Sequence, residues 1–199
     1  MSNNKRKFSA LAAVLMLFLL AGAISCKGFF VNSPDSLTIS PDPVSFDSVG
    51  DVQQLTAQAT FGTQTQDVTT STIWKSANGC SIVPSTTNIG QMTAIGTGSS
   101  VTITATYNGV ADTVTATLPN GITISPCGNN GRFTSGTSTP MTATSGGTDV
   151  TSTTTWTSSN TNIVKFTGST ATFGPTTGTA VITADDGTDT DGKLQVTVQ

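Results

Sequence analysis

The side chains that most often carry out chemistry in proteins are scarce in this chain of 199 residues. It contains no His, and all 11 acidic residues are Asp, so Glu is absent as well. A Ser or Cys nucleophile is normally activated by a neighbouring His, and that pair cannot form without one. The composition therefore predicts no catalytic residue, no enzyme activity and no cofactor.

Acidic side chains are densest near the C-terminus, at Asp185, Asp186, Asp189 and Asp191. Calcium binds several oxygen ligands supplied by a sharp loop. If residues 187–198 are compared with the 12-residue calcium loop of an EF-hand, however, Gly187 stands at the first ligand position and Val198 replaces the closing Glu. We therefore favour a solvated hairpin tip over a calcium site and predict no metal. Asp67 and Asp149 lie in turns, where we expect them to accept hydrogen bonds from nearby backbone N–H groups.

The charge balance excludes another class of partner. Charged residues make up 10% of the chain, against about 25% in an ordinary soluble domain. If the basic N-terminal segment is removed, five basic and 11 acidic residues remain, for a net charge of −6. An acidic surface repels phosphate backbones, and no basic stripe interleaved with aromatic residues is present. We expect no nucleic acid partner.

The N-terminus has the pattern of a signal peptide. Lys5, Arg6 and Lys7 precede the apolar run 8–23, which is shorter than the roughly 20 residues that a membrane-spanning helix needs. A retained membrane helix is the less favoured alternative. The segment 23–26, Ala-Ile-Ser-Cys, resembles the lipobox of bacterial lipoproteins.

That resemblance implies cleavage before Cys26 and attachment of lipid to its thiol. Residues 1–25 would then be the signal peptide and 26–36 a tether. It also implies a protein of the cell envelope, held in the outer membrane or at the cell surface with the membrane as a partner through its lipid anchor. Cleavage at the same bond by an ordinary signal peptidase is the alternative, and it would give a secreted protein with a free thiol.

The rest of the chain is a repeat of about 80 residues. Several short motifs recur in the same order, and the chain's only two Trp residues, Trp74 and Trp156, lie 82 positions apart in equivalent places. The recurring motifs are Ile-Ser-Pro at 39–41 and 124–126, Leu/Met-Thr-Ala at 55–57 and 141–143, Asp-Val-Thr at 67–69 and 149–151, and Ile-Thr-Ala at 103–105 and 182–184.

Apolar and polar residues alternate within each repeat, which is typical of strands with one buried face. Asn108-Gly109 between two such runs predicts a tight hairpin. We expect an all-β chain of two tandem immunoglobulin-like β-sandwich domains, 37–119 and 120–199, with Trp74 and Trp156 as core anchors. Expected strands lie near 37–41, 52–61, 71–76, 81–84, 91–95, 100–107, 110–118, 121–125, 139–144, 153–158, 162–166, 170–174, 179–184 and 193–198.

Cys80 and Cys127 are the remaining thiols, one in each repeat. Cys80 follows the Trp74 strand and Cys127 lies at the first strand of the second repeat, so both are expected at the junction of the two domains. A disulfide there is natural in an oxidising envelope, and closing this loop contributes about 4 kcal/mol in the chain-entropy model. Two free thiols or an intermolecular bond are the alternatives.

The ordered motifs resemble group 2 bacterial immunoglobulin-like domains (Big2), which occur in intimin- and invasin-type surface proteins. The second repeat carries the closest counterparts, Trp-Thr-Ser-Ser-Asn at 156–160 and Gly-Thr-Ala-Val-Ile-Thr-Ala at 178–184. The resemblance implies a structural spacer or a weak adhesion module. The alternative is a specific binding protein for a surface glycan or host protein, acting through loops of the second domain. Phe133, Phe166 and Phe173 are expected in the core rather than on a sugar-binding surface.

Overall fold

A computed structural model of the chain describes residues 33–188 and 191–199. Almost all of their regular structure is β-strand, with one short 3-10 helix, η1 (Thr69–Ser71). The strands of the N-terminal half are β1 (Ser36–Ser40), β2 (Val44–Ser45), β3 (Val52–Gln54), β4 (Thr56–Phe61), β5 (Gln64–Asp67), β6 (Ile73–Ser76), β7 (Ile82–Pro84), β8 (Gln91–Ala94), β9 (Ser100–Tyr107) and β10 (Val110–Thr117).

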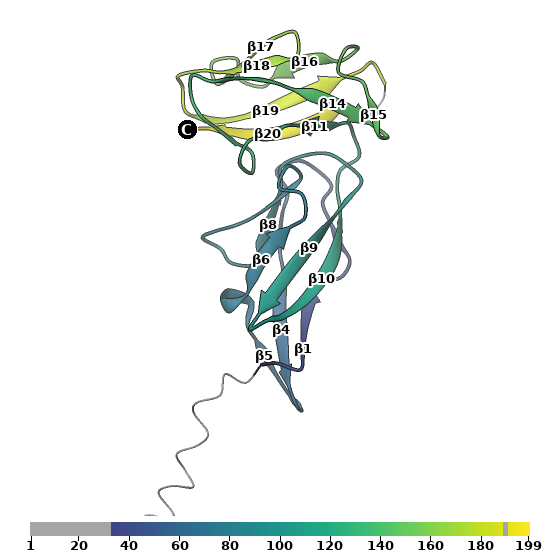
Figure 1. Cartoon of the computed structure of the whole chain (residues 1–199), viewed down its shortest axis with the longest axis vertical. Coiled ribbons are helices and arrows are strands. Elements are labelled where there is room, and N and C mark those ends of the chain that lie inside the picture. The colour runs from purple at the N-terminus through teal and green to yellow at the C-terminus, as the bar shows by residue number, and fades with distance from the viewer. Residues whose placement is uncertain (1–32, 189–190) are drawn as a thin grey trace, which may run out of the picture. The chain divides into compact units, whose positions relative to one another are not determined.

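The C-terminal half repeats this series (Figure 1). Its strands are β11 (Thr123–Ser125), β12 (Arg132–Phe133), β13 (Ser138–Pro140), β14 (Thr142–Ser145), β15 (Thr148–Asp149), β16 (Thr155–Ser158), β17 (Val164–Thr167), β18 (Thr170–Phe173), β19 (Gly178–Asp185) and β20 (Gly192–Val198).

The sheet topology is the same in both halves. The N-terminal half has a four-stranded sheet in the order β2-β10-β9-β6 and two three-stranded sheets, β1-β4-β5 and β3-β8-β7. In the C-terminal half the orders are β12-β20-β19-β16, β11-β14-β15 and β13-β18-β17. Because β3 and β4 are successive parts of one extended run, the two smaller sheets continue into each other opposite the four-stranded sheet. This is the strand order of an immunoglobulin-like sandwich.

Alternation of residue types explains the two-layer packing. In β9 the side chains of Val101, Ile103 and Ala105 are buried, while the intervening Thr102 is exposed and Thr104 half-buried. Thr and Val are β-branched and favour the extended backbone of a strand. The hairpin from β9 to β10 turns at residues 108–109, both with positive φ (47° and 85°), as the Asn-Gly sequence predicts.

Each half has its own hydrophobic core, so the duplicated pattern builds two separate sandwiches. Large side chains with almost no exposed surface fill the first core: Phe46, Leu55, Ile82, Met92 and Ile103. Those of the second core are Ile122, Met141, Phe173, Ile182 and Leu194. Residues 34–199 nevertheless group as one compact unit, and the domain boundary expected between 119 and 120 stays a prediction.

Each expected strand has a counterpart within a few residues. The strands that were not expected are the short pieces β2, β5, β12 and β15. The expected runs 52–61 and 139–144 are each divided in two, because Leu55 and Met141 interrupt the pairing. In the described part of the chain, none of the helical structure has the length and apolar character that crossing a bilayer requires.

Candidate functional site

Some of the residues singled out from the sequence lie outside the described part. Cys26, the predicted site of lipid attachment, is one, and Asp189 of the acidic cluster is another. Asp185 and Asp186 accept hydrogen bonds from the backbone of the same turn, at Gly187 N and Thr188 N. Within residues 33–188 and 191–199, no group of three potential metal ligands is arranged to hold an ion.

The two repeated Asp-Val-Thr turns have the local role expected of them. Asp67 Oδ1 accepts a hydrogen bond from Thr69 N at 2.9 Å, and Asp149 Oδ1 accepts one from Thr151 N at 2.9 Å. These bonds favour the ionised carboxylates. The Thr69 hydroxyl and N–H lower the pKa of Asp67 below its ordinary value of 3.8, and Thr151 lowers the pKa of Asp149 in the same way.

Cys80 and Cys127 lie together where the two halves meet. Their sulfur atoms are 2.01 Å apart in a disulfide, and their Cα atoms are 5.2 Å apart. Cys127 belongs to the C-terminal core, and Cys80 packs against that core from the N-terminal half. The predicted pair is thus within bonding reach, and its oxidation in the isolated protein stays a prediction.

A second link at the junction is a short antiparallel pairing of residues 95–97 with strand β20. Gly96 and Leu194 form a β-bridge. On either side of it, Gln195 N donates to Ile95 O at 2.6 Å and Thr97 N donates to Lys193 O at 3.0 Å. The N-terminal half therefore covers part of a sheet edge that belongs to the C-terminal half.

The Thr97 side chain makes two hydrogen bonds across this junction. Thr97 is 4% exposed. The hydroxyl donates to Ile122 O at 2.6 Å and accepts a hydrogen bond from Lys193 N at 2.9 Å. Both groups belong to the C-terminal half, so one buried side chain satisfies polar atoms on two of its segments.

Apolar packing crosses the same boundary. Ile95 is 7% exposed and is part of the C-terminal core, although it follows strand β8 of the N-terminal half. Gly131 permits this approach, because a Cβ atom there would lie 3.0 Å from both Ile95 Cδ1 and Gln195 O. Backbone pairing, a buried hydroxyl, a shared core residue and a disulfide thus join the halves.

The two repeated Trp side chains differ in burial. Trp156 is 9% exposed, and Phe166 stacks on it with ring centroids 5.5 Å apart. Trp74 is only partly buried and packs against the rim of the N-terminal core. Its Nε1 donates to Thr69 O at 3.2 Å. The expected core anchor of the first repeat is therefore at the core's edge, since Pro84 occupies the place of Phe166, 82 positions earlier.

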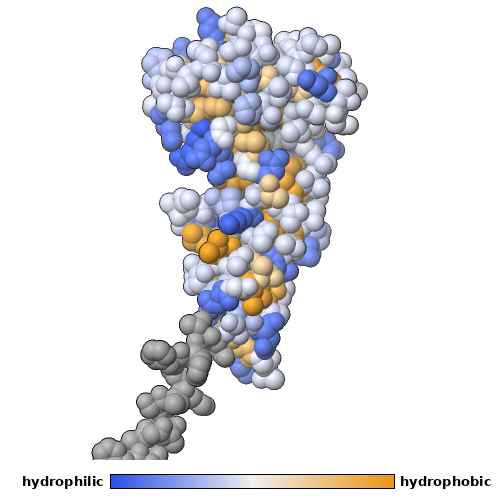
Figure 2. Space-filling view, viewed as in Figure 1, coloured by the Kyte–Doolittle hydropathy of each residue, from blue (hydrophilic) through white to orange (hydrophobic). Residues whose placement is uncertain are grey.

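Trp74 lines a surface pocket of about 420 Å³ that is formed mainly by the N-terminal half, with Asn130 contributed by the C-terminal half. The other apolar lining residues are Ile73, Pro84 and Ile89, and Ile73 is 62% exposed. Polar lining comes from Thr72, Ser85, Thr86 and Asn130. Figure 2 shows apolar surface beside a recess on one flank of the molecule.

A second pocket of about 380 Å³ adjoins the first, since both are lined by Pro84, Ser85, Thr86 and Asn130. It adds Gln91, Asn129 and Arg132. We call the two pockets together the Trp74 groove. Arg132 is exposed, and its Nη1 donates to Gln199 Oε1 at 3.1 Å. The groove was not predicted from the sequence, although Pro84 stands at the position where the second repeat has Phe166.

Comparisons with known proteins add little beyond the fold. No protein-family model matches the chain, and no curated protein matches its sequence. Solved structures similar to it include domains 5–6 of the S-layer protein SbsC, with 18% identity, a TM-score of 0.35, and coverage of 83% of this chain and 97% of that one. A titin A168–A169 fragment matches with 14% identity, a TM-score of 0.26, and coverage of 82% and 98%. The immunoglobulin-like fold follows from the strand order itself.

Proposed function

We propose that the chain is a lipid-anchored, non-enzymatic protein of the cell envelope whose two domains, 37–119 and 120–199, act as a stiff spacer. The group 2 bacterial immunoglobulin-like family is part of this proposal, supported by the order of the repeated motifs. The anchor is supported by the sequence at Cys26 and by the basic and apolar segment before it.

The observation that carries the spacer role is the junction between the halves. A flexible pair of domains would be joined by an exposed linker with few contacts across it. In this chain Thr97 is buried between segments of the other half, and Ile95 belongs to the other half's core. Bending at the junction would break these hydrogen bonds and expose apolar surface, so the pair should resist bending.

A pair of substitutions at Thr97 tests the stiffness. Thr97→Val keeps the shape of the side chain but leaves Ile122 O and Lys193 N without their partner. We expect this to cost about 1–3 kcal/mol of unfolding free energy and to broaden the distribution of interdomain distances seen by small-angle X-ray scattering. Thr97→Ser keeps the hydroxyl and is the matched control. A wild-type scattering profile that requires a broad ensemble would refute the spacer role.

The anchor is tested separately by the intact mass of the protein purified from its native host. Loss of residues 1–25 together with the added mass of acyl chains on Cys26 is the expected result. A mass that shows cleavage without acylation would favour secretion. Peptide mapping of the same sample without reduction should recover Cys80 and Cys127 in one linked peptide pair, and two free thiols would remove the disulfide from the junction.

A further inference from the structure

The Trp74 groove lies where the two repeats depart from each other. The connection from β7 to β8 covers residues 85–90, whereas the equivalent hairpin from β17 to β18 turns within residues 168–169. The connection from β11 to β12 covers 126–131, against 41–43 between β1 and β2. Residues from both longer segments line the groove. The groove is therefore an addition to the fold and not a consequence of it.

The apolar lining is also specific to the first repeat. Ile73 is exposed, and the equivalent residue of the second repeat, 82 positions later, is Thr155. In the C-terminal half, a polar pocket of about 520 Å³ is lined by Asp149, Thr151, Ser152, Thr154 and Ser169, with Gly168, and not by Thr155, Trp156 or Phe166, the counterparts of the apolar groove residues. The second repeat has the same strand with Thr at this place, so the sandwich fold does not require an apolar side chain at position 73.

The chemistry of the groove suits a sugar ring. Because Trp74 Nε1 already donates to Thr69 O, the part of the indole that remains accessible offers apolar contact. The Thr86 hydroxyl and the Asn130 amide lie beside it. The Thr72 and Ser85 hydroxyls also line the pocket, but the first donates to Val68 O and the second accepts from the N–H groups of Thr87 and Asn88. A few polar groups converging on an apolar floor are typical of small-ligand sites, and a saccharide presents C–H faces together with hydroxyl groups.

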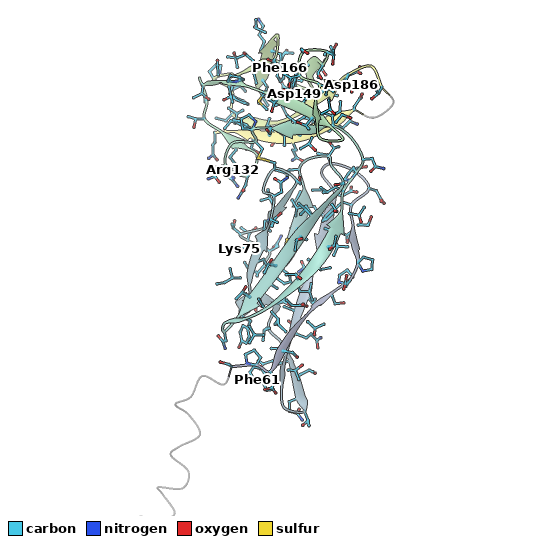
Figure 3. The ribbon with its side chains drawn as sticks, turned by 45° about the vertical axis from the view of Figure 1, so that its right-hand side comes forward. Phe61, Lys75, Arg132, Asp149, Phe166 and Asp186 are labelled. Atoms are coloured by element: carbon cyan, nitrogen blue, oxygen red, sulfur yellow. A yellow bond between two sulfur atoms is a disulfide. The ribbon has the colours of Figure 1, made fainter. Side chains whose placement is uncertain are left out.

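The charged residues in and near the Trp74 groove indicate the sign of the charge that its ligand carries. All of the chain's acidic residues are Asp, yet none of them lines either pocket of the groove. Arg132 lines one of the pockets, and Lys75 follows Trp74 on β6. Figure 3 shows Arg132 and Lys75 on the same flank of the molecule. A guanidinium group pairs in fork geometry with a carboxylate, so the groove favours an anionic ligand on an otherwise acidic protein.

We propose that the Trp74 groove binds an acidic saccharide chain, with a sugar ring against Trp74 and Ile73 and a carboxylate at Arg132. This site combines residues of the first half with the connection 126–131 and Arg132 of the second domain, so it overlaps only in part with the second-domain loops that the sequence offered as an alternative binding site. It is also independent of the lipid anchor, because every residue of the groove lies between 72 and 132.

The test is a titration of the full-length protein in detergent with a tetramer of galacturonic acid, with maltotetraose as the neutral probe. Isothermal calorimetry and Trp fluorescence should show saturable binding of the acidic tetramer in the millimolar range or tighter, and weaker binding of the neutral one. The acidic tetramer should lose affinity as salt rises, because exposed charge pairs are screened.

Two variants locate the site. Ile73→Thr copies the second repeat, and Arg132→Gln removes the charge; each should weaken binding of the acidic tetramer by about three- to tenfold. Arg132→Gln should also reduce the preference over the neutral tetramer. Both residues are exposed, so neither change should alter folding. Matched controls are Thr155→Ile and Lys165→Gln in the second repeat, which should leave binding unchanged.

Three outcomes would overturn the proposal. One is the absence of saturable binding of either tetramer. Another is binding that Ile73→Thr and Arg132→Gln leave at wild-type strength. The third is a dimer seen by analytical ultracentrifugation that Ile73→Thr dissociates, since that would assign the exposed Ile to contact with a second copy of the chain.

Discussion

The N-terminal and C-terminal halves share one strand order, but the equivalent residues Trp74 and Trp156 differ in burial. In the C-terminal half Phe166 covers Trp156, and the ring is buried. In the N-terminal half Pro84 takes that place, Ile73 replaces Thr155, and Trp74 stays partly accessible at the floor of a groove. A Trp that both repeats retain can thus serve packing in one half and be available for binding in the other.

The sheet edges differ in a related way. In the N-terminal half, Ile39 N donates to Asp112 Oδ2 at 2.8 Å, so a side chain of β10 satisfies a backbone group of β1. In the C-terminal half, residues 95–97 of the preceding half pair with β20 instead. The first half thus bonds one of its own strands through a side chain, whereas part of the β20 edge of the second half is paired by the preceding half.

The largest expected effect on stability comes from removing each of the two indole side chains. Trp156→Ala should lower the free energy of unfolding by about 3–5 kcal/mol, because it empties a buried site. Trp74→Ala should cost roughly 1–3 kcal/mol, since part of that ring is already in water. Urea titration of both variants measures the difference. Equal losses would mean that the two rings are equally buried and would remove the contrast between the halves.

A smaller effect is expected from exchanging the residues that cover the indoles. Phe166→Ala should uncover Trp156, with a loss of about 1–3 kcal/mol and stronger quenching of its fluorescence by iodide. Pro84→Phe should shield Trp74 from iodide and close the groove to the acidic tetramer. To assign the signals, each change is combined with Trp→Phe at the other indole. Unchanged quenching in both variants would show that residues 84 and 166 do not control access.

The smallest expected effect is on the pH dependence of stability, through Asp67 and Asp149 in the two repeated turns. The pKa of Asp67 and that of Asp149 are both lowered by Thr in the folded protein. Their contribution to stability is therefore complete above the ordinary pKa of 3.8 and is lost as pH falls through the lower folded pKa. A small decrease of melting temperature below about pH 4 is expected. The double variant Asp67→Asn, Asp149→Asn keeps an acceptor oxygen and should flatten that part of the profile; an unaltered profile would contradict this assignment.

Much of the fold could be predicted from the sequence because it follows from local patterns. Alternation located β9, β10 and β20, and Asn-Gly located the hairpin at 108–109. Strand β5 was missed because all its residues are polar and exposed, so no buried face marks it. Strands β2 and β12 have two residues each, too few to show a period, and their pairing depends on a distant strand.

The candidate site was less predictable, for physical reasons. Trp74 and Trp156 occupy equivalent places in the repeat, and the difference in their burial follows the residues at 84 and 166, which are distant in sequence from the indoles. Phe133 and Phe173 are buried and stack with ring centroids 4.0 Å apart, as a core position requires, whereas Phe166 is partly exposed. Pairing of 95–97 with β20 joins segments almost a hundred residues apart, and neither segment carries a motif for it.

The position of Ile95 has a consequence for how such a chain can be divided or extended. A fragment that begins at the second repeat would lack one apolar side chain of its own interior and would present β20 with bare N–H and C=O groups to any other chain in solution. Cutting between the repeats should therefore yield an insoluble C-terminal product. Adding a third copy by simple concatenation would fail for the same reason, unless the graft also reproduced the Ile-Gly-Thr tripeptide of its predecessor.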